Sequence, residues 1–203
     1  TTQLLSDQGF IVAVTDDQGI EVEVAYTGRD FEKKFYAEHT NRTFCKTLLE
    51  NGLRDPISGE FGKTLVFAVS QNHAAKLAQI LNEMADQLWP SRYSSDFAMQ
   101  VTSHVADAQK MTVNFANNNL GGHSDFAPNY RTSKTRVCVT VGMMTTGYDA
   151  PDILNLALMR PVFSPSDFVQ IKGRGTRKHN FTQEMFDPKQ KALLGDVSKD
   201  SFK

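Results

Sequence analysis

From Thr64 onward, apolar runs of strand length alternate with amphipathic stretches of helix length. Residues 64–69 form one such apolar run, and Ser70 then offers an N-cap to a helix. The inward face of that helix is predicted to carry Ala74, Leu77, Ala78, Leu81, Ala85 and Leu88. Strand–helix alternation of this kind predicts a mostly parallel sheet covered on both faces, the α/β class, in which ligands bind outside the carboxyl ends of the strands.

The same alternation continues along the rest of the domain. It predicts strands at 97–102, 136–141 and 153–159, a helix at 105–115, and a last helix that begins with Ser164 as cap and Pro165 in its first position. Before residue 64, two β-branched runs at 10–15 and 20–26 flank a turn and predict a hairpin. Residues 30–51 have near-helical apolar spacing and end in Asn51-Gly52, a plausible C-cap.

Composition limits the partners and the compartment. The 22 Lys and Arg balance 23 Asp and Glu in 203 residues, so any contact with nucleic acid must come from local placement of charge. The apolar runs are far shorter than the ~18 residues that a membrane-spanning helix needs. Cys45 and Cys138 stand apart inside apolar segments, which predicts buried thiols in a reducing compartment.

Gly62-Lys63-Thr64 matches the end of a phosphate-binding P-loop, but its context does not fit. The pattern needs a glycine where Ile57 stands, and it needs the strand before the loop rather than after it. The segment is therefore predicted to be a loop that enters a strand.

Two further segments can carry phosphate chemistry. Residues 170–177 read Gln-Ile-Lys-Gly-Arg-Gly-Thr-Arg, so Gln170 and Arg174 share a helix face while Arg177 follows near the helix end. Guanidinium groups suit bidentate phosphate contact and can stabilise charge on a transferring phosphoryl group, although a solvated basic patch is the alternative.

Residues 145–151, Thr-Thr-Gly-Tyr-Asp-Ala-Pro, follow a core strand, where a glycine allows backbone approach to phosphate and Asp149 can accept from a ribose hydroxyl. A plain Gly/Pro turn is the alternative there.

Together with residues 65–70 and Thr102-Ser103, these segments resemble motifs IV, IVa, V and VI of superfamily 2 helicases, in that order. Residues 154–156 and 160–164, followed by 170–177, are similar to the second RecA-like motor domain of the R subunit of type I restriction enzymes. The resemblance implies a RecA-like three-layer α/β/α fold with a mostly parallel sheet, preceded by a β-hairpin and a linker helix. It implies that residues 1–58 join a first motor domain, that 59–180 form the helicase C-terminal domain, and that 181–203 are an extension.

The resemblance also assigns roles to single residues. Arg174 and Arg177 would be arginine fingers that reach ATP on the first motor domain. The nucleotide would also meet Gly147, Asp149 and Gln170, and the DNA backbone would meet Ser70, Thr102, Ser103 and Thr146. Gly142 stands where the family often has an acidic residue. ATP and Mg²⁺ are the implied cofactors, held mainly by the first motor domain because this chain has no complete Walker A or Walker B motif. The chain alone is therefore expected to be inactive.

The resemblance thus implies the second motor domain of an ATP-dependent double-stranded DNA translocase in a type I restriction-modification system. Its expected partners are duplex DNA, the first motor domain, and the modification and specificity subunits, in the cytoplasm and without a membrane. Three alternatives stay open: another superfamily 2 helicase that separates strands, a non-catalytic interaction domain of the same fold, and a self-sufficient P-loop enzyme that uses Lys63.

Overall fold

The computed structural model describes residues 10–15, 21–26, 38–124, 127–142, 149–162 and 164–203. The chain divides into two compact units, Thr1–Asn41 and Arg42–Lys203, and each is described by itself. In the first unit, β1 (Phe10–Thr15) and β2 (Glu21–Tyr26) pair antiparallel, with Phe10 opposite Tyr26 and Thr15 opposite Glu21. The predicted hairpin is confirmed, and its turn lies outside the described residues.

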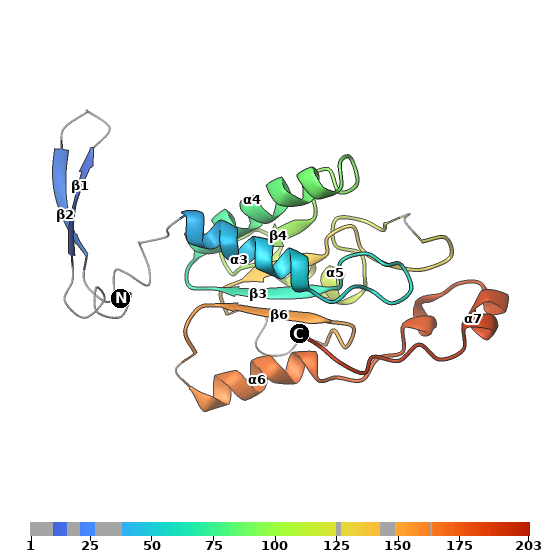
Figure 1. The fold of residues 1–203 in the computed structure, drawn as a ribbon. Helices are drawn as coiled ribbons and strands as arrows, with labels where there is room; N and C mark the ends of the chain where they lie inside the picture. The colour runs from blue at the N-terminus through green and yellow to red at the C-terminus, as the bar shows by residue number, and fades with distance from the viewer. Residues whose placement is uncertain (1–9, 16–20, 27–37, 125–126, 143–148, 163) are drawn as a thin grey trace. The chain divides into compact units, whose positions relative to one another are not determined.

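A parallel sheet forms the centre of the second unit (Figure 1). Within the described residues it has four strands in the order β4-β5-β3-β6. Their bounds are β3 Thr64–Ala68, β4 Ala98–Gln100, β5 Val137–Thr140 and β6 Asn155–Met159. β3 is central, with Thr64 opposite Val137 on one side and Asn155 on the other. All pairings are parallel, which confirms the α/β class that the strand–helix alternation predicts.

Helices cover both faces of this sheet and complete the three layers. α3 (Glu38–Asn51) and α4 (Gln71–Leu88) lie on one side in Figure 1, and α6 (Pro165–Gly175) lies on the other. α5 (Ala108–Ala116) shares the second face, since its Phe115 packs in one cluster with Ile171 of α6. Successive side chains of a strand point to opposite faces of the sheet. Val66 of β3 therefore packs in the core on the side of α3 and α4, and Leu65 packs in the core on the side of α5 and α6.

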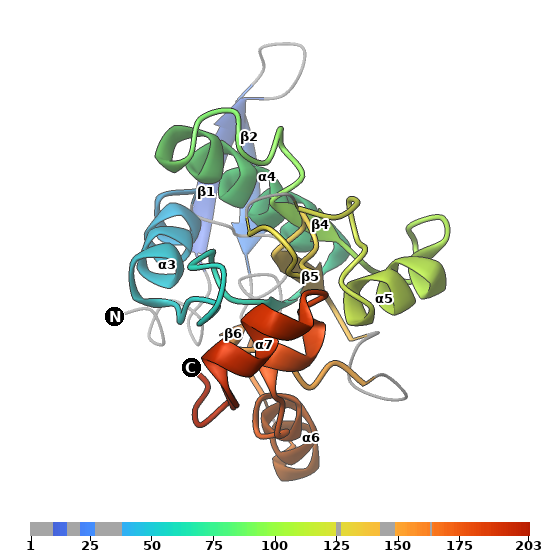
Figure 2. The ribbon, with the colours of Figure 1, turned by 90° about the vertical axis from the view of Figure 1, so that its right-hand side faces the viewer.

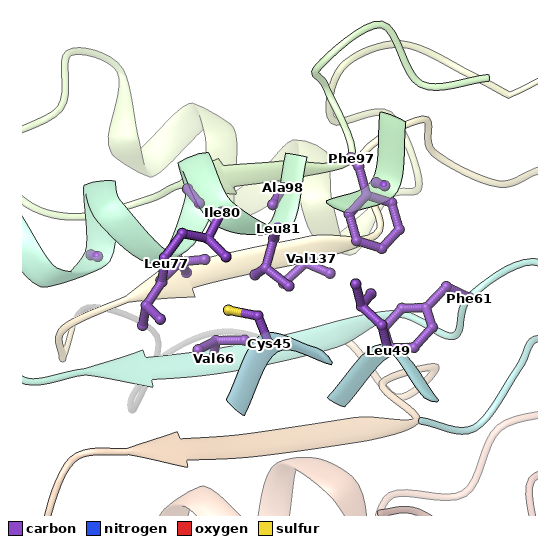
Figure 3. Close-up of a cluster of buried hydrophobic side chains, with 14 of the residues drawn as sticks. Cys45, Leu49, Phe61, Val66, Leu77, Ile80, Leu81, Phe97, Ala98 and Val137 are labelled. Carbon is purple, nitrogen blue, oxygen red and sulfur yellow. The ribbon is translucent and has the colours of Figure 1, made fainter. Parts of the chain in front are cut away.

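The core beneath α3 and α4 is shown in Figure 3. Cys45 and Leu49 of α3 meet Leu77 and Leu81 of α4 above Val66 of the sheet. Burial raises the pKa of the Cys45 thiol to about 12, so the thiol stays protonated and acts as a small apolar group.

Both cysteines are buried and neither belongs to a disulfide, as predicted. The prediction that Leu88 points inward is wrong: it is 57% exposed. Leu88 instead lines a surface hollow together with Met84 and with Leu49 of α3.

The helix ends follow from local chemistry. Ser70 caps α4 by accepting a hydrogen bond from the backbone N–H of His73, and Ser164 caps α6 with Pro165 next, both as predicted. At the end of α3, the Gly52 N–H donates to the Leu48 carbonyl at 2.8 Å. A Cβ on Gly52 would lie 2.5 Å from the Phe61 ring, so close packing explains the glycine here.

The C-terminal segment packs against the end of the sheet where the strands begin. It contains a 3-10 turn, η1 (Phe181–Glu184), and α7 (Pro188–Leu194), and Figure 2 shows α7 in front of the sheet. Lys203 then pairs with β6, donating to the Leu154 carbonyl at 2.9 Å and accepting from Leu156 N–H at 2.6 Å. The boundaries predicted at residues 58 and 180 stay predictions, and the segment after 180 lies in the same compact unit as the sheet.

Among the described residues, no helix combines the length and the apolar character needed to cross a membrane.

Candidate functional site

The topology sorts the predicted functional residues onto two edges of the sheet. Ser70 follows β3, and Thr102 and Ser103 follow β4, so all three lie at the edge where the parallel strands end. Asp149 and Arg177 lie at the opposite edge. Asp149 belongs to the segment that leads into β6, and α6 returns to the start of β6 before Arg177. Gly147 and Thr146 lie outside the described residues.

At the carboxyl edge, the three hydroxyl groups differ in how open they are. The Ser70 side chain is half-buried and caps α4. Thr102 is buried, and its hydroxyl accepts from Gln100 Nε2 at 3.3 Å. Ser103 is exposed. Of these three, Ser103 presents the hydroxyl that a ligand can reach without displacing a contact within the chain.

At the amino edge, the structure brings together two residues that the sequence predicts for one nucleotide. The Arg177 guanidinium donates to Asp149 Oδ1, and this ion pair is open to solvent, with the side chains 38% and 74% exposed. The segment after β5 and the segment after α6 therefore meet at this pair. A surface pair of this kind is worth only about 0–1 kcal/mol, so either group can exchange its partner for a ligand.

Gln170 and Arg174 sit in different surroundings although they are one helical turn apart. Gln170 is exposed, and its amide donates to Ser166 Oγ at 3.5 Å. Arg174 is buried, with only 6% of its surface exposed. Between them, Gly173 faces open space, whereas a Cβ on Gly175 would overlap the ring of Phe202. The absence of a side chain at Gly175 therefore lets the C-terminal segment of the same chain pack closely against α6.

Lys63, the lysine of the P-loop-like segment, is buried and makes its contacts within the protein. It is 2% exposed, its ammonium lies 2.6 Å from Asp152 Oδ2, and it donates to the Phe115 carbonyl at 2.7 Å. Burial lowers the pKa of Lys63, and the Asp152 carboxylate opposes that shift. Burial acts to raise the pKa of Asp152, but Lys63 holds it below its ordinary value. The ammonium is therefore not placed to contact a phosphate in solvent.

Sequence reasoning missed Asp152 and the buried polar network around it. Asp152 also accepts from the Asn118 amide at 3.1 Å. Nearby, Arg136 donates to the Phe61 carbonyl at 2.6 Å and lies 3.7 Å from Asp55, which accepts from the Tyr130 hydroxyl at 2.9 Å. The only signal in the sequence is the occurrence of charged residues directly before apolar strands, because each partner is contributed by a distant segment.

No metal site is formed by the part of the chain that the structure describes: it holds no group of three or more His, Cys, Asp or Glu side chains able to bind an ion.

Comparison with known proteins agrees with the resemblance that the motifs indicate. No protein-family model matches the chain. Over 202 residues the chain is 30% identical to the endonuclease subunit of the type I restriction enzyme EcoKI of Escherichia coli (strain K12), a match that covers 98% of this chain. This relative confirms the resemblance to type I restriction R subunits. The chain spans 14% of the relative's length, so the activity of that whole subunit is not transferred by the similarity.

Two solved structures are also similar. One is a fragment of an HsdR subunit of a type I restriction enzyme from Vibrio vulnificus YJ016, with 28% identity and a TM-score of 0.49, over 73% of this chain and 27% of that one. The other is the helicase domain of Hef from Pyrococcus furiosus, with 15% identity and a TM-score of 0.40, over 73% of this chain and 25% of that one.

Proposed function

We propose that this chain is the second motor domain of an ATP-dependent double-stranded DNA translocase of a type I restriction-modification system. The observation that carries the proposal is the Asp149–Arg177 pair, which joins the two phosphate-directed segments at one solvent-open edge. The similarity of nearly the whole chain to a restriction endonuclease subunit supports it. The modification and specificity subunits, duplex DNA and the first motor domain are the proposed partners.

On the nucleotide side, Arg177 fits the role of a group that reaches ATP held by the first motor domain. Its guanidinium is accessible, permanently charged, and paired with an exposed carboxylate. When ATP is bound, hydrolysis places negative charge on the γ-phosphoryl group, and an inserted arginine stabilises that charge. Asp149 is then released toward the ribose. Gln170 is exposed, so its amide is accessible to the same nucleotide. Arg174 is buried, so it must either act from its buried position or move to reach the nucleotide.

On the DNA side, Ser70 and Ser103 stand at the edge where the strands end. Hydroxyl contacts to phosphates carry no sequence information, which suits an enzyme that moves along duplex DNA of any sequence. Because the proposed nucleotide and DNA contacts lie at opposite edges, a rotation of this rigid sheet about the nucleotide would displace the DNA contacts. That arrangement is the physical basis on which hydrolysis could drive translocation.

The test is DNA-dependent ATP hydrolysis by the full-length subunit that contains this segment. Arg177→Ala should lower turnover by about 10³- to 10⁵-fold, the range measured for arginine fingers. Lys172→Ala is the matched control, since it removes an exposed cation from the last turn of α6, five residues before Arg177, and should leave turnover within about two-fold. Arg177 is preferred to Arg174 because loss of a buried arginine would confound catalysis with folding.

Near-normal turnover in the Arg177→Ala enzyme would contradict the assignment and favour a non-catalytic domain of the same fold. Strand displacement on a forked duplex then separates the two enzymatic possibilities. The proposed translocase should hydrolyse ATP and move without releasing single strands, whereas accumulation of displaced strand would identify a strand-separating helicase.

A further inference from the structure

A basic cavity of about 590 Å³ lies between the end of α6 and the C-terminal segment. Its polar lining residues are Lys178, His179, Asn180, Gln183, Ser198 and Lys199. It adjoins the Asp149–Arg177 pair, because Lys178 follows Arg177 and because Pro151, two residues after Asp149, completes the lining. None of the described lining residues is a carboxylate. The cavity therefore gathers positive charge and hydrogen-bond donors.

Two of the lining residues retain unused hydrogen-bonding capacity. Lys199 donates to the carbonyls of Pro151 and Ile153, which leaves one of the three N–H donors of its ammonium for a ligand. His179 Nε2 is buried and has no hydrogen-bond partner among the described residues. Buried polar atoms are normally satisfied, but Asp152 Oδ1 is likewise buried without a hydrogen-bond partner among the described residues and its charge acts on the His179 ring, so the nitrogen does not by itself indicate a ligand.

The charges that surround the cavity favour an anion. The carboxylate that acts on Lys199 belongs to Asp152, and that charge is already paired with Lys63 at 2.6 Å. Burial lowers the pKa of His179. The carboxylates of Asp152 and Glu184 act to raise it, and Lys63 and Lys199 act to lower it. Burial lowers the pKa of Lys199 to about 8, against the pull of Asp152, so the ammonium form lacks full compensation in the free chain. An anion in the cavity would supply that compensation.

We propose that this cavity binds a phosphate-type oxyanion, with Lys199 and Lys178 as its charged ligands. The site is distinct from the residues assigned above to the nucleotide and to DNA, and it does not require them. The same chemistry is offered by a free nucleotide or pyrophosphate and by the phosphates of a DNA backbone, and the experiment separates these sources.

The experiment is calorimetric titration of this chain with pyrophosphate at pH 7 and near-physiological salt. Lys199→Gln keeps a neutral donor for the two carbonyls but removes the charge, and should weaken binding about 10- to 100-fold, as expected for loss of a charge-assisted hydrogen bond. Lys178→Gln removes an exposed charge and should weaken it about two- to five-fold. Lys189→Gln is the control: an exposed lysine of the same segment that does not line the cavity.

Wild-type chain that shows no saturable binding, or Lys178→Gln and Lys199→Gln proteins that bind as wild type does, would overturn the proposal. Thermal unfolding of each variant establishes that it is folded, and Lys178→Gln keeps the test valid if Lys199→Gln unfolds. Competition against bound pyrophosphate then identifies which source of phosphate the cavity binds. Displacement of pyrophosphate by ATP but not by a blunt duplex supports a nucleotide, and displacement by the duplex supports backbone phosphate.

A pH series gives an independent readout. Sulfate keeps its charge between pH 7 and 9, so a change in its affinity reports the protein. A group with a pKa of about 8 is about nine-tenths protonated at pH 7 and one-tenth at pH 9, so sulfate affinity should fall about ten-fold over this range. The Lys199→Gln protein should lose that dependence, and an unchanged profile in it would count against Lys199 as a ligand.

Discussion

The buried Lys63–Asp152 pair should be among the most sensitive positions of the second unit. Asp152→Asn keeps the side-chain shape but removes the charge that compensates Lys63, which is 2% exposed. Removing one partner from a buried ion pair costs about 3–5 kcal/mol, because the remaining charge stays buried without compensation. At about 2–4 °C per kcal/mol for a unit of this size, the midpoint of thermal unfolding should fall by about 6–20 °C.

Urea unfolding followed by circular dichroism measures the loss directly, and a double-mutant cycle isolates the pair. Lys63→Met should also destabilise the protein strongly, since it leaves Asp152 unpaired. The double variant should lose clearly less than the sum of the two single losses, because no uncompensated charge is left inside. If Asp152→Asn costs less than about 1 kcal/mol, or if the two losses simply add, the reasoning is refuted.

The pH dependence of this difference has a definite sign. The pKa of Asp152 in the folded protein lies below its ordinary value of 3.8. A carboxylate with a depressed pKa contributes stability that is complete above its unfolded-state pKa and is lost as the pH falls through its folded-state pKa. The gap between wild type and Asp152→Asn should therefore persist from pH 7 to about pH 5 and shrink below pH 4.

Two further predictions concern glycine packing and a helix cap. Gly175→Ala should push the Phe202 ring away and loosen the pairing of the C-terminus with β6, seen as faster hydrogen exchange at the Leu156 amide, whereas Gly173→Ala, which faces open space, should leave that exchange unchanged. Equal protection of the Leu156 amide in both variants would contradict this packing. Ser70→Ala should cost about 0.5–2 kcal/mol of unfolding free energy through loss of the α4 cap, and an unaltered urea midpoint would show that the cap contributes nothing.

Local signals explain which parts of the fold could be predicted. Ser70 and Ser164 were predictable as caps because a cap needs only its own helix, and the strands were predictable because buried parallel strands are continuous apolar runs. The exposure of Leu88 was not predictable, because periodicity defines a helix face but not the extent of the sheet beneath it. The burial of Arg174 was not predictable either: its helical position is clear from the sequence, but its burial depends on what packs around the end of α6.

For the candidate site, the sequence allowed the motif residues to be named but not their long-range partners. The residues of the two phosphate-directed segments could be named from their spacing, and the Asp149–Arg177 contact agrees with their grouping. The partners of Lys63 could not be inferred, because Asp152 and Phe115 are brought to it by the sheet order and the crossover helices. Long-range ion pairs of this kind have no sequence period, so only the three-dimensional arrangement identifies them.

The turn that carries Asp149 is held from three directions. Lys63 binds Asp152 from the start of β3, Lys199 binds the carbonyls on either side of Asp152, and Arg177 binds Asp149 from the end of α6. The first contact is buried and fixed, whereas the other two come from charged groups that a phosphate-type ligand can also engage. A ligand that engages Lys199 or Arg177 therefore acts on one and the same turn. We therefore expect occupancy of the basic cavity and the proposed binding of a nucleotide at Asp149 and Arg177 to alter each other's affinity through residues 149–153.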